Sequence, residues 1–338
     1  MTNKERYRKV LVTGAGGFIG HHLVKVLKKK GFWVRGADIK RPDFEPTPAD
    51  EFLLGDLRVF QNCERAVKEI DDAYGLAADM GGIGYITAFH ANLARNNVLI
   101  NSNMLEAAHK EGVSRYLYSS SACVYPSFRQ NQEENVALRE EDALPADPEK
   151  GYGWEKLFSE QLATYYFEDH GLDVRIVRFH NVYGPLTTYE GGREKAPAAI
   201  CRKVAEADDG AAIEVWGDGN QTRSFCYIDD CTDGVLRIMD SDYRRPLNLG
   251  TEELVSVNDL VDLTCNVGGK RLRKVYKPGR PQGVRGRNSD NALLRRTIGW
   301  EPKIPLRAGL EATYEWVWQE LDRQGRARPP GPLAVKAA

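Results

Sequence analysis

The feature that most constrains the fold is a glycine-rich turn close to the start of the chain. Residues 9–13 read Lys-Val-Leu-Val-Thr, which predicts a buried strand, and residues 14–20 read Gly-Ala-Gly-Gly-Phe-Ile-Gly. A helical pattern follows over residues 21–30. Glycines at such a turn let the backbone approach a pyrophosphate, and the helix N-terminus offers unpaired N–H groups and a positive dipole end. The unit therefore predicts a dinucleotide site at the edge of an α/β sheet.

An acidic residue follows at the spacing that a dinucleotide site needs. Residues 32–38 predict the second strand, and Asp38 stands at its end. A carboxylate there accepts both ribose hydroxyls and repels a 2′-phosphate, which favours NAD over NADP, although Lys40 and Arg41 follow closely. The strand expected over residues 52–57 contains a second acid, Asp56, which we expect at the adenine edge.

Strands and helices continue to alternate through the first half of the chain. Apolar segments at residues 73–78, 115–118 and 174–178 predict strands, and a helical pattern covers residues 90–111. Such alternation predicts a doubly wound parallel sheet of the Rossmann type, whose ligands lie beyond the carboxyl ends of the strands. A length of 338 residues suits such a domain with a smaller companion.

The β/α rhythm breaks after Tyr183-Gly184-Pro185, where we expect the smaller domain to begin. The expected division is a NAD-binding domain over residues 1–182 with a returning segment at about 225–255, a smaller α/β substrate-binding domain over 183–224 and 256–325, and a flexible tail over 326–338. Within these parts we expect returning strands at residues 225–228 and 247–249, a helix over 257–267 capped by Ser256, and a terminal helix over 310–321.

Composition excludes several classes of protein. The 47 lysines and arginines nearly cancel the 48 aspartates and glutamates, so no overall field attracts nucleic acid or an anionic membrane. No apolar run approaches the length of a membrane span, and residues 1–8 lack an apolar signal region, so a cytoplasmic location is expected. The six cysteines lack zinc-ligand spacing, which argues against a structural metal and against a disulfide framework.

Tyr152 and Lys156 form the pair with the clearest chemical use. They are four residues apart at the start of an amphipathic run that ends near His170, so they lie on the same side of a helix. A fixed ammonium beside a phenol favours the phenolate and would lower the phenol pKa toward service as a base. One such spacing is expected by chance in a chain of this composition, so the rest of the sequence has to support it.

Other polar residues also follow expected strands. Ser121 and Cys123 come after the strand at 115–118 and are two residues apart, so they can point the same way at the carboxyl edge. The stretch 79–84, Asp-Met-Gly-Gly-Ile-Gly, suits close ligand approach and a plain loop equally well. Asn96, Asn97 and Asn101 are interpreted as solvated or capping residues, and His180 as structural.

Basic residues gather in the expected smaller domain. Several of them on glycine-rich loops opposite the cofactor would suit a substrate that carries a pyrophosphate, although such clusters are often solvated faces. They are Arg193, Lys195, Arg202, Lys203, Arg223, Arg285 and Arg287.

Taken together, three motifs resemble the extended short-chain dehydrogenase/reductase family of nucleotide-sugar epimerases and dehydratases. They are Thr13-Gly14-x-x-Gly17-x-x-Gly20, Ser119 to Tyr125, and Tyr152-x-x-x-Lys156. Longer segments at residues 78–82, 121–126, 178–185, 191–199, 216–225 and 283–291 are similar to the branch of that family that inverts C3 and C5 of GDP-mannose. The resemblance extends from about Lys9 to Glu320 and departs at Tyr85, Ala88, Phe89 and Trp154, which puts the product in doubt but not the fold.

The resemblance implies a role for each matched residue. Tyr152, with Lys156 and Ser121, would take the proton of the sugar 4-hydroxyl while bound NAD takes the C4 hydride, and Cys123 and Lys195 would be the acid/base pair on opposite faces of the ring. Implied cofactor contacts are Gly14, Gly17, Phe18, Ile19, Gly20, Asp38, Asp56, Tyr152 and Lys156. Implied substrate contacts are Gly81, Ser121, Cys123, Asn181, Glu194, Lys195, Ala196, Lys203, Gln221, Arg223 and Arg287. A homodimer is also implied, and no metal.

Two alternatives stay open at this point. A related 4-epimerase or 4,6-dehydratase would share the Tyr152 step but would have no use for Cys123 and Lys195 as an inverting pair. A non-catalytic protein that only senses a nucleotide would be expected to lack Tyr152, Lys156 or Asp38, and all three are present. Whether inversion stops at C5, giving GDP-L-gulose, or continues to C3, giving GDP-L-galactose, is not determined by these residues.

Overall fold

The computed structural model describes residues 8–134 and 137–330 of the chain. Seven parallel strands form its main sheet, in the order β11-β6-β5-β4-β1-β2-β3, and the predicted doubly wound α/β fold is confirmed. The strands are β1 (Lys9–Thr13), β2 (Trp33–Asp38), β3 (Glu51–Leu54), β4 (Asp72–Gly75), β5 (Arg115–Ser121), β6 (Asp173–Phe179) and β11 (Pro246–Leu249). The order reverses at β1, so β1 and β4 flank a switch point at which ligands of such sheets bind.

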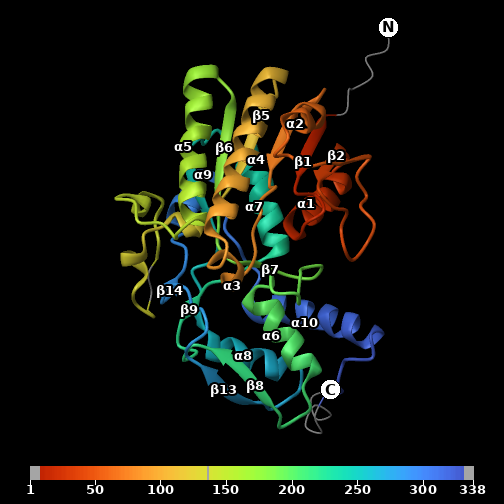
Figure 1. Cartoon of the computed structure of the whole chain (residues 1–338), viewed down its shortest axis with the longest axis vertical. Helices are drawn as coiled ribbons and strands as arrows, with labels where there is room; N and C mark the ends of the chain where they lie inside the picture. Colours follow the sequence, from red (N-terminus) through yellow and green to blue (C-terminus); the bar gives the residue numbers. More distant parts are fainter. Residues whose placement is uncertain (1–7, 135–136, 331–338) are drawn as a thin grey trace.

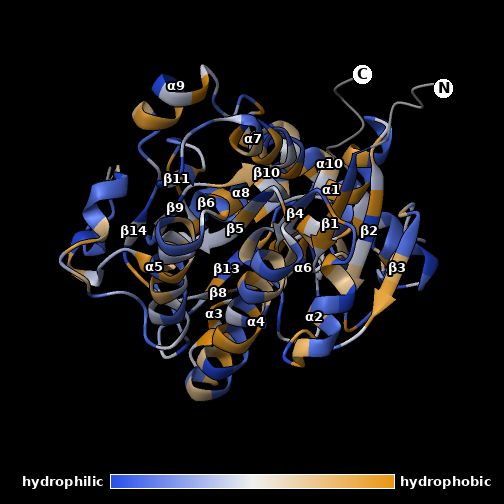
Figure 2. Cartoon of the chain, turned by 90° about the horizontal axis from the view of Figure 1, so that it is seen from above, coloured by the Kyte–Doolittle hydropathy of each residue, from blue (hydrophilic) through white to orange (hydrophobic). Residues whose placement is uncertain are grey.

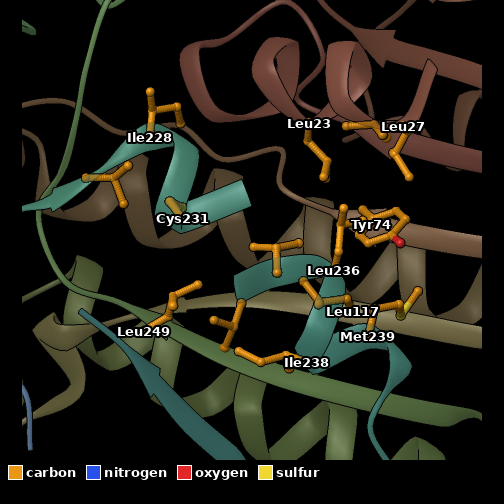
Figure 3. Close-up of a cluster of buried hydrophobic side chains, with 14 of the residues drawn as sticks. Leu23, Leu27, Tyr74, Leu117, Ile228, Cys231, Leu236, Ile238, Met239 and Leu249 are labelled. Atoms are coloured by element: carbon orange, nitrogen blue, oxygen red, sulfur yellow. The ribbon is translucent and has the colours of Figure 1, made fainter. Parts of the chain in front are cut away.

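Helices cover both faces of this sheet (Figure 1). On one face, α1 (Phe18–Lys29) packs against α7 (Ile228–Asp240), and their apolar side chains meet those of Tyr74 and Leu117 from the sheet, as Figure 3 shows. On the other face, α2 (Phe60–Val67), α4 (His90–Glu111) and α5 (Tyr152–His170) cover a second core. Because β1 and β6 are buried on both faces of the sheet, their sequences are nearly continuous apolar runs, and these runs predicted the two strands.

The remaining elements form a second body below the carboxyl ends of the main sheet (Figure 1). Its helices are α6 (Ala196–Glu206), α8 (Val257–Val267) and α10 (Leu306–Arg323), which share a third core with β8 (Ala212–Trp216). The short strands are β7 (Val182–Tyr183), β9 (Thr222–Arg223), β10 (Cys226–Tyr227), β12 (Val255–Ser256), β13 (Arg273–Lys277) and β14 (Gly286–Arg287). Ser256 caps α8 by accepting a hydrogen bond from the Asp259 N–H at 3.0 Å, as predicted.

The chain passes between the two bodies several times. After β6 it enters the second body through α6, β8 and β9, and it returns through β10, α7 and β11. It leaves again through α8 and β13, and α9 (Ala292–Ile298) then lies beside β11 before α10 ends the fold. Figure 2 shows hydrophobic and hydrophilic residues interleaved along the helices, as expected where one side of each helix faces a core.

Several boundaries differ from those expected. The first helix begins at Phe18 instead of His21, because the last residues of the glycine turn already form its first turn. The third strand ends at Leu54, so Asp56 lies in the loop beyond it. The strand β5 extends through Ser121, so the serines are strand residues, and the terminal helix begins at Leu306, after Pro305.

The last described residues contact the second body. Arg326 forms ion pairs with Glu190 at 2.8 Å and with Glu206 at 2.5 Å, and the Arg328 N–H donates to the Ala205 carbonyl at 2.9 Å. The rest of the expected flexible tail, residues 331–338, lies outside the described residues. Within residues 8–134 and 137–330, no helix combines the length and the apolar character needed to cross a bilayer.

Candidate active site

A cavity of about 1050 Å³ lies at the carboxyl edge of the main sheet and continues into the second body. All of the residues predicted for cofactor, substrate and catalysis line it, although they come from distant parts of the chain. They are Gly14, Gly17, Phe18, Ile19, Gly20, Asp38, Asp56, Gly81, Ser121, Cys123, Tyr152, Lys156, Asn181, Glu194, Lys195, Ala196, Lys203, Gln221, Arg223 and Arg287. One continuous space is therefore available for a dinucleotide and a nucleotide sugar together.

The glycine turn forms one end of this cavity. Gly14 has a φ of 70°, and a Cβ there would lie 2.9 Å from the backbone of Leu76 and Ala77, which follow the neighbouring strand β4. A Cβ on Gly20 would overlap the carbonyl oxygen of Gly14. The N–H groups of residues 14–17 donate within the protein, but the turn has no side chains at these glycine positions that would cover the α1 N-terminus, which stays open to a pyrophosphate. These features fit the cofactor NAD, whose phosphates this turn would hold.

Two acids line the same end of the cavity. Asp38 accepts hydrogen bonds from the N–H groups of Gly16 at 2.9 Å and Lys40 at 3.1 Å, and burial raises the pKa of its carboxyl. Asp56 is paired with Arg58 at 2.6 Å, and this arginine lowers the pKa of Asp56. Sequence reasoning did not single out Arg58, which also lines the cavity. Arg58 reaches the cavity because it follows β3, which pairs with β2, the strand that ends in Asp38.

Tyr152 and Lys156 stand together in the middle of the cavity wall. The Lys156 Nζ lies 5.6 Å from the centre of the Tyr152 ring and donates to the Ser119 carbonyl oxygen at 2.9 Å. Ser121 lies beside the Tyr152 hydroxyl and acts to lower its pKa. Both side chains belong to the first two turns of α5, and both are buried. The predicted triad of tyrosine, lysine and serine is therefore assembled.

The expected pKa of Tyr152 needs a correction. Burial, reinforced by the charge of Glu155, raises the Tyr152 pKa well above its ordinary value, and Ser121 opposes this only in part. Burial also lowers the pKa of Lys156. The protein alone does not lower the phenol pKa, because removing both groups from water outweighs their mutual stabilisation.

Behind Tyr152 and Lys156 lies a buried hydrogen-bond network that contains two asparagines expected to be solvated or capping. Asn97 and Asn101 are neither solvated nor capping: they are 0% and 5% exposed. Asn97 donates to Glu155 at 2.8 Å and binds the backbone of Asp79 on both sides, while Asn101 donates to Ser159 at 3.1 Å. Burial raises the pKa of Glu155 to about 7.

We therefore predict a pH-dependent contribution of Glu155 to stability. The unfolded chain releases this proton near pH 4.5, but the folded protein keeps it to about pH 7, so wild-type stability should fall as pH rises between these values. Glu155→Gln keeps an acceptor for Asn97 and cannot ionise, so its stability should fall less over the same range. Thermal unfolding across this range measures the difference. Glu168→Gln, on the exposed side of α5, should follow the wild type, and an equal slope for Glu155→Gln would contradict the assignment.

Cys123 and Lys195 face the cavity from the two bodies. The Cys123 thiol is 8% exposed and lies 3.4 Å from the Arg287 guanidinium, which favours the thiolate. Burial nevertheless raises the Cys123 pKa, and the nearby carboxylate of Glu149, which was not predicted from the sequence, raises it further. Burial lowers the pKa of Lys195, and the nearby Cys123 acts in the opposite direction. The raised pKa keeps the Cys123 thiol protonated, so burial opposes its use as a base and the Arg287 guanidinium favours that use.

The predicted basic cluster divides into paired and unpaired members. Arg202 and Arg285 are ion-paired with Glu206 and Asp218, at 2.9 and 2.7 Å, and Arg193 lies 3.5 Å from Asp79. Arg223 and Arg287 form no ion pair with any described residue. Burial, together with the charge of Arg287, lowers the pKa of Arg223 to about 9. Two neighbouring cations held out of water in this way favour binding of a diphosphate.

The other predicted substrate residues have backbone partners that fix their side chains. Asn181 donates to the Ser224 carbonyl at 3.0 Å, Lys203 to Glu214 at 3.0 Å, and Gln221 to Trp216 at 2.8 Å. The Gln221 side-chain oxygen is buried without a partner among the described residues and is free to accept a hydrogen bond from a ligand. His180 is fully buried and contacts Asn248 at 3.1 Å, which agrees with a structural role.

Comparisons with known proteins were made on this basis. Residues 10–250 match the model of the NAD dependent epimerase/dehydratase family. The chain is 47% identical over 318 residues to GDP-mannose 3,5-epimerase of Arabidopsis thaliana, covering 94% of this chain and 84% of the relative. GDP-mannose 3,5-epimerase 1 of Oryza sativa subsp. japonica is 46% identical over 318 residues, covering 94% and 83%.

Among solved structures, UDP-glucose 4-epimerase of Thermotoga maritima with UDP-glucose superposes with a TM-score of 0.84 at 26% identity, covering 93% of this chain and 99% of that chain. The structure of MoeE5 with UDP-glucose and NAD gives a TM-score of 0.80 at 30% identity, covering 93% and 99%.

Proposed function

Because this chain belongs to the NAD dependent epimerase/dehydratase family, we propose that it is a GDP-mannose 3,5-epimerase that works with NAD. The observation that carries the proposal is the meeting of two chemical pairs in one cavity. Tyr152 with Lys156 suits reversible oxidation of a hydroxyl, and Cys123 with Lys195 suits proton exchange at carbon. The sequence identity of 47% to a GDP-mannose 3,5-epimerase supports the choice of substrate.

Oxidation at C4 is the first step that the geometry supports. Lys156 and Ser121 stabilise the phenolate of Tyr152, which takes the proton of the 4-hydroxyl and becomes the neutral phenol. NAD, when bound at the glycine turn and Asp38, supplies the hydride acceptor for this step and the donor for the final reduction. The ketone at C4 then makes the hydrogens at C3 and C5 removable, because the resulting carbanion is an enolate.

Inversion needs two groups on opposite faces of the ring. Cys123 lies in the short 3-10 helix Ala122–Val124 that follows β5, and Lys195 lies at the start of α6, so the thiol and the ammonium reach the cavity from different bodies. One removes the proton, and the other delivers a proton to the opposite face. Arg223, Arg287 and Lys203 hold the diphosphate, while Asn181, Gln221, Gly81, Glu194 and Ala196 complete the substrate contacts.

Proton NMR of GDP-mannose incubated with the protein in D₂O tests the function. Exchange at C5 alone would identify GDP-L-gulose as the product, and exchange at C5 and C3 would identify GDP-L-galactose. A 4-epimerase would leave C5 protonated, a 4,6-dehydratase would lose water and form a C6 methyl group, and a nucleotide sensor would leave the spectrum unchanged. Each of these three results would overturn the proposal.

Asp38→Ala tests the assignment of the cofactor. The substitution should weaken NAD binding by about 1.5–3 kcal/mol, because charge-assisted hydrogen bonds to the ribose are lost. It should also narrow the preference for NAD over NADP, since the repulsion of a 2′-phosphate disappears. Titration of both cofactors measures the two effects. Asp43→Ala, which removes an exposed carboxylate from the following loop, should bind both cofactors like the wild type, and unchanged discrimination in Asp38→Ala would remove Asp38 from the site.

A homodimer is part of the proposal. Trp154, Phe158 and Tyr165 are 51%, 51% and 52% exposed and lie on one side of α5, four and seven residues apart. Large apolar side chains gathered on one helix suit burial against a second copy. Sedimentation analysis of the purified protein would decide between monomer and dimer. The expected cytoplasmic location stays a prediction of the sequence.

A further inference from the structure

The segment that carries Lys195 into the cavity has little support of its own. Residues 191–195 read Gly-Gly-Arg-Glu-Lys, and Lys195 is the last residue before α6. Gly191 and Gly192 have φ values of 90° and 86°, and a Cβ added to either would meet no atom within 4 Å. The packing of these two glycines does not fix the lysine. The Gly192 N–H donates to the Glu194 carboxylate at 2.6 Å and Lys195 leads directly into α6, and contacts made across the cavity mouth add to this local support.

Those contacts come from residues 79–86 of the other body. The Gly82 N–H donates to the Arg193 carbonyl at 3.0 Å, and a Cβ on Gly82 would overlap the carbonyl oxygen of Glu194. The Arg193 guanidinium lies 4.0 Å from the centre of the Tyr85 ring and donates to the Tyr85 hydroxyl at 2.6 Å. A cation stacked on a ring and bonded to its hydroxyl is held in both direction and distance.

The Tyr85 hydroxyl connects this arginine to the rigid part of the fold. It donates to an Asp79 carboxylate oxygen at 2.9 Å, and the other oxygen of Asp79 accepts from Asn96 at 3.0 Å. The Asp79 backbone is bound on both sides by Asn97, which also contacts Glu155 beside Lys156. The contacts thus continue from α4 and α5, which carry the oxidation chemistry, to the segment before Lys195.

We propose that Tyr85 is a positioning residue that holds Lys195 against the sugar ring by fixing Arg193 on Asp79. The inference rests on the proposed function and adds to it a residue that lies outside the matched segments of the sequence. Proton delivery to one face of a carbanion depends on placement within about 1 Å. Loss of the Tyr85 hydroxyl should therefore impair delivery from Lys195 more than binding, oxidation or proton removal.

The test compares Tyr85→Phe with Thr87→Val. The first removes the hydroxyl that joins Arg193 to Asp79. The second removes a hydroxyl from the same segment whose hydrogen bonds go only to the Ile83 and Gly84 carbonyls. For Tyr85→Phe we expect KM for GDP-mannose within about twofold of wild type and kcat for inversion lower by about tenfold to a hundredfold.

Isotope partitioning separates positioning from general damage. In D₂O, Tyr85→Phe should return GDP-mannose that carries deuterium at C5 without inversion, because the carbanion forms normally and is protonated again on its original face. Thr87→Val should give the wild-type ratio of inverted to returned sugar. Equal ratios in Tyr85→Phe and Thr87→Val would overturn the proposal. A wild type without C5 exchange would instead overturn the proposed function, whatever the behaviour of Tyr85.

A second variant keeps the proposal testable if Tyr85→Phe does not fold. Arg193→Lys keeps the charge on a side chain that is 50% exposed but removes the fork that bonds Tyr85 and Asp79. It should show the same shift toward returned, deuterated GDP-mannose. The double variant should reduce inversion little more than either single variant does, because the two substitutions break the same contact. Fully additive losses of inversion would contradict a shared role.

Discussion

Tyr152→Phe should bind NAD and GDP-mannose with nearly wild-type affinity and should show no measurable turnover. The ring is buried at the start of α5 and keeps its packing without the hydroxyl. The hydroxyl is the group that Ser121 contacts and that would accept the C4 hydroxyl proton. General base catalysis typically contributes about 10²- to 10⁴-fold, and here the same group acts in both oxidation and reduction.

The measurement is NADH absorbance and product formation after mixing with GDP-mannose, alongside titration of both ligands. Tyr165→Phe provides the matched control, because it removes a hydroxyl from an exposed tyrosine on the same helix. It should turn over like the wild type. Turnover of Tyr152→Phe near the wild-type rate would take Tyr152 out of the mechanism.

Cys123→Ala should stop the reaction after oxidation. Tyr152, Lys156 and Ser121 are unchanged in this variant, so the hydride can still leave C4, but no thiol remains to strip a proton from the ketone. Mixing with GDP-mannose should produce NADH absorbance and a 4-keto sugar, with no deuterium entering C5 from D₂O. If Cys123 were only a small apolar filler, the substitution would cost about 1 kcal/mol of stability and exchange would continue.

Cys265→Ala is the control for this experiment. Cys265 is 7% exposed, close to the 8% of Cys123, but it belongs to α8 and does not line the cavity. It should lose a similar amount of stability and keep full activity. Deuterium at C5 in Cys123→Ala at a rate near wild type would rule out the acid/base role and favour a 4-epimerase or dehydratase.

Sequence periodicity predicted the fold well where local signals and packing agree. The helices α4 and α8 have the predicted ends, because Gly112 stops the first in a left-handed conformation and Ser256 caps the second. The start of α1 was placed three residues late because Phe18, Ile19 and Gly20 belong to a turn motif. A glycine inside a helix is unfavourable on propensity alone, and at Gly20 a close backbone contact overrides that preference.

The residues that form the candidate site could be predicted from the sequence, but the directions of their pKa shifts could not. Cys123 was expected at this cavity because it follows a strand of a parallel sheet, and Tyr152 because of its spacing from Lys156, whereas the role of Lys195 came from the family resemblance. The direction of the Tyr152 and Cys123 pKa shifts depends on burial, which no spacing encodes. Glu149 and Arg58 were not predicted for a related reason, because their places at the cavity depend on residues distant in the sequence.

The repeated passage of the chain between its two bodies limits how such a protein can acquire new specificity. Val182 of β7 pairs with Cys226 of β10, and the segments on either side of them alternate between the bodies. Neither body is an uninterrupted stretch of gene, so recombination at a single point cannot transplant one without splitting the other. A single recombination event therefore cannot exchange one whole body, and point substitution and loop length remain as routes by which the accepted sugar can change one wall segment at a time.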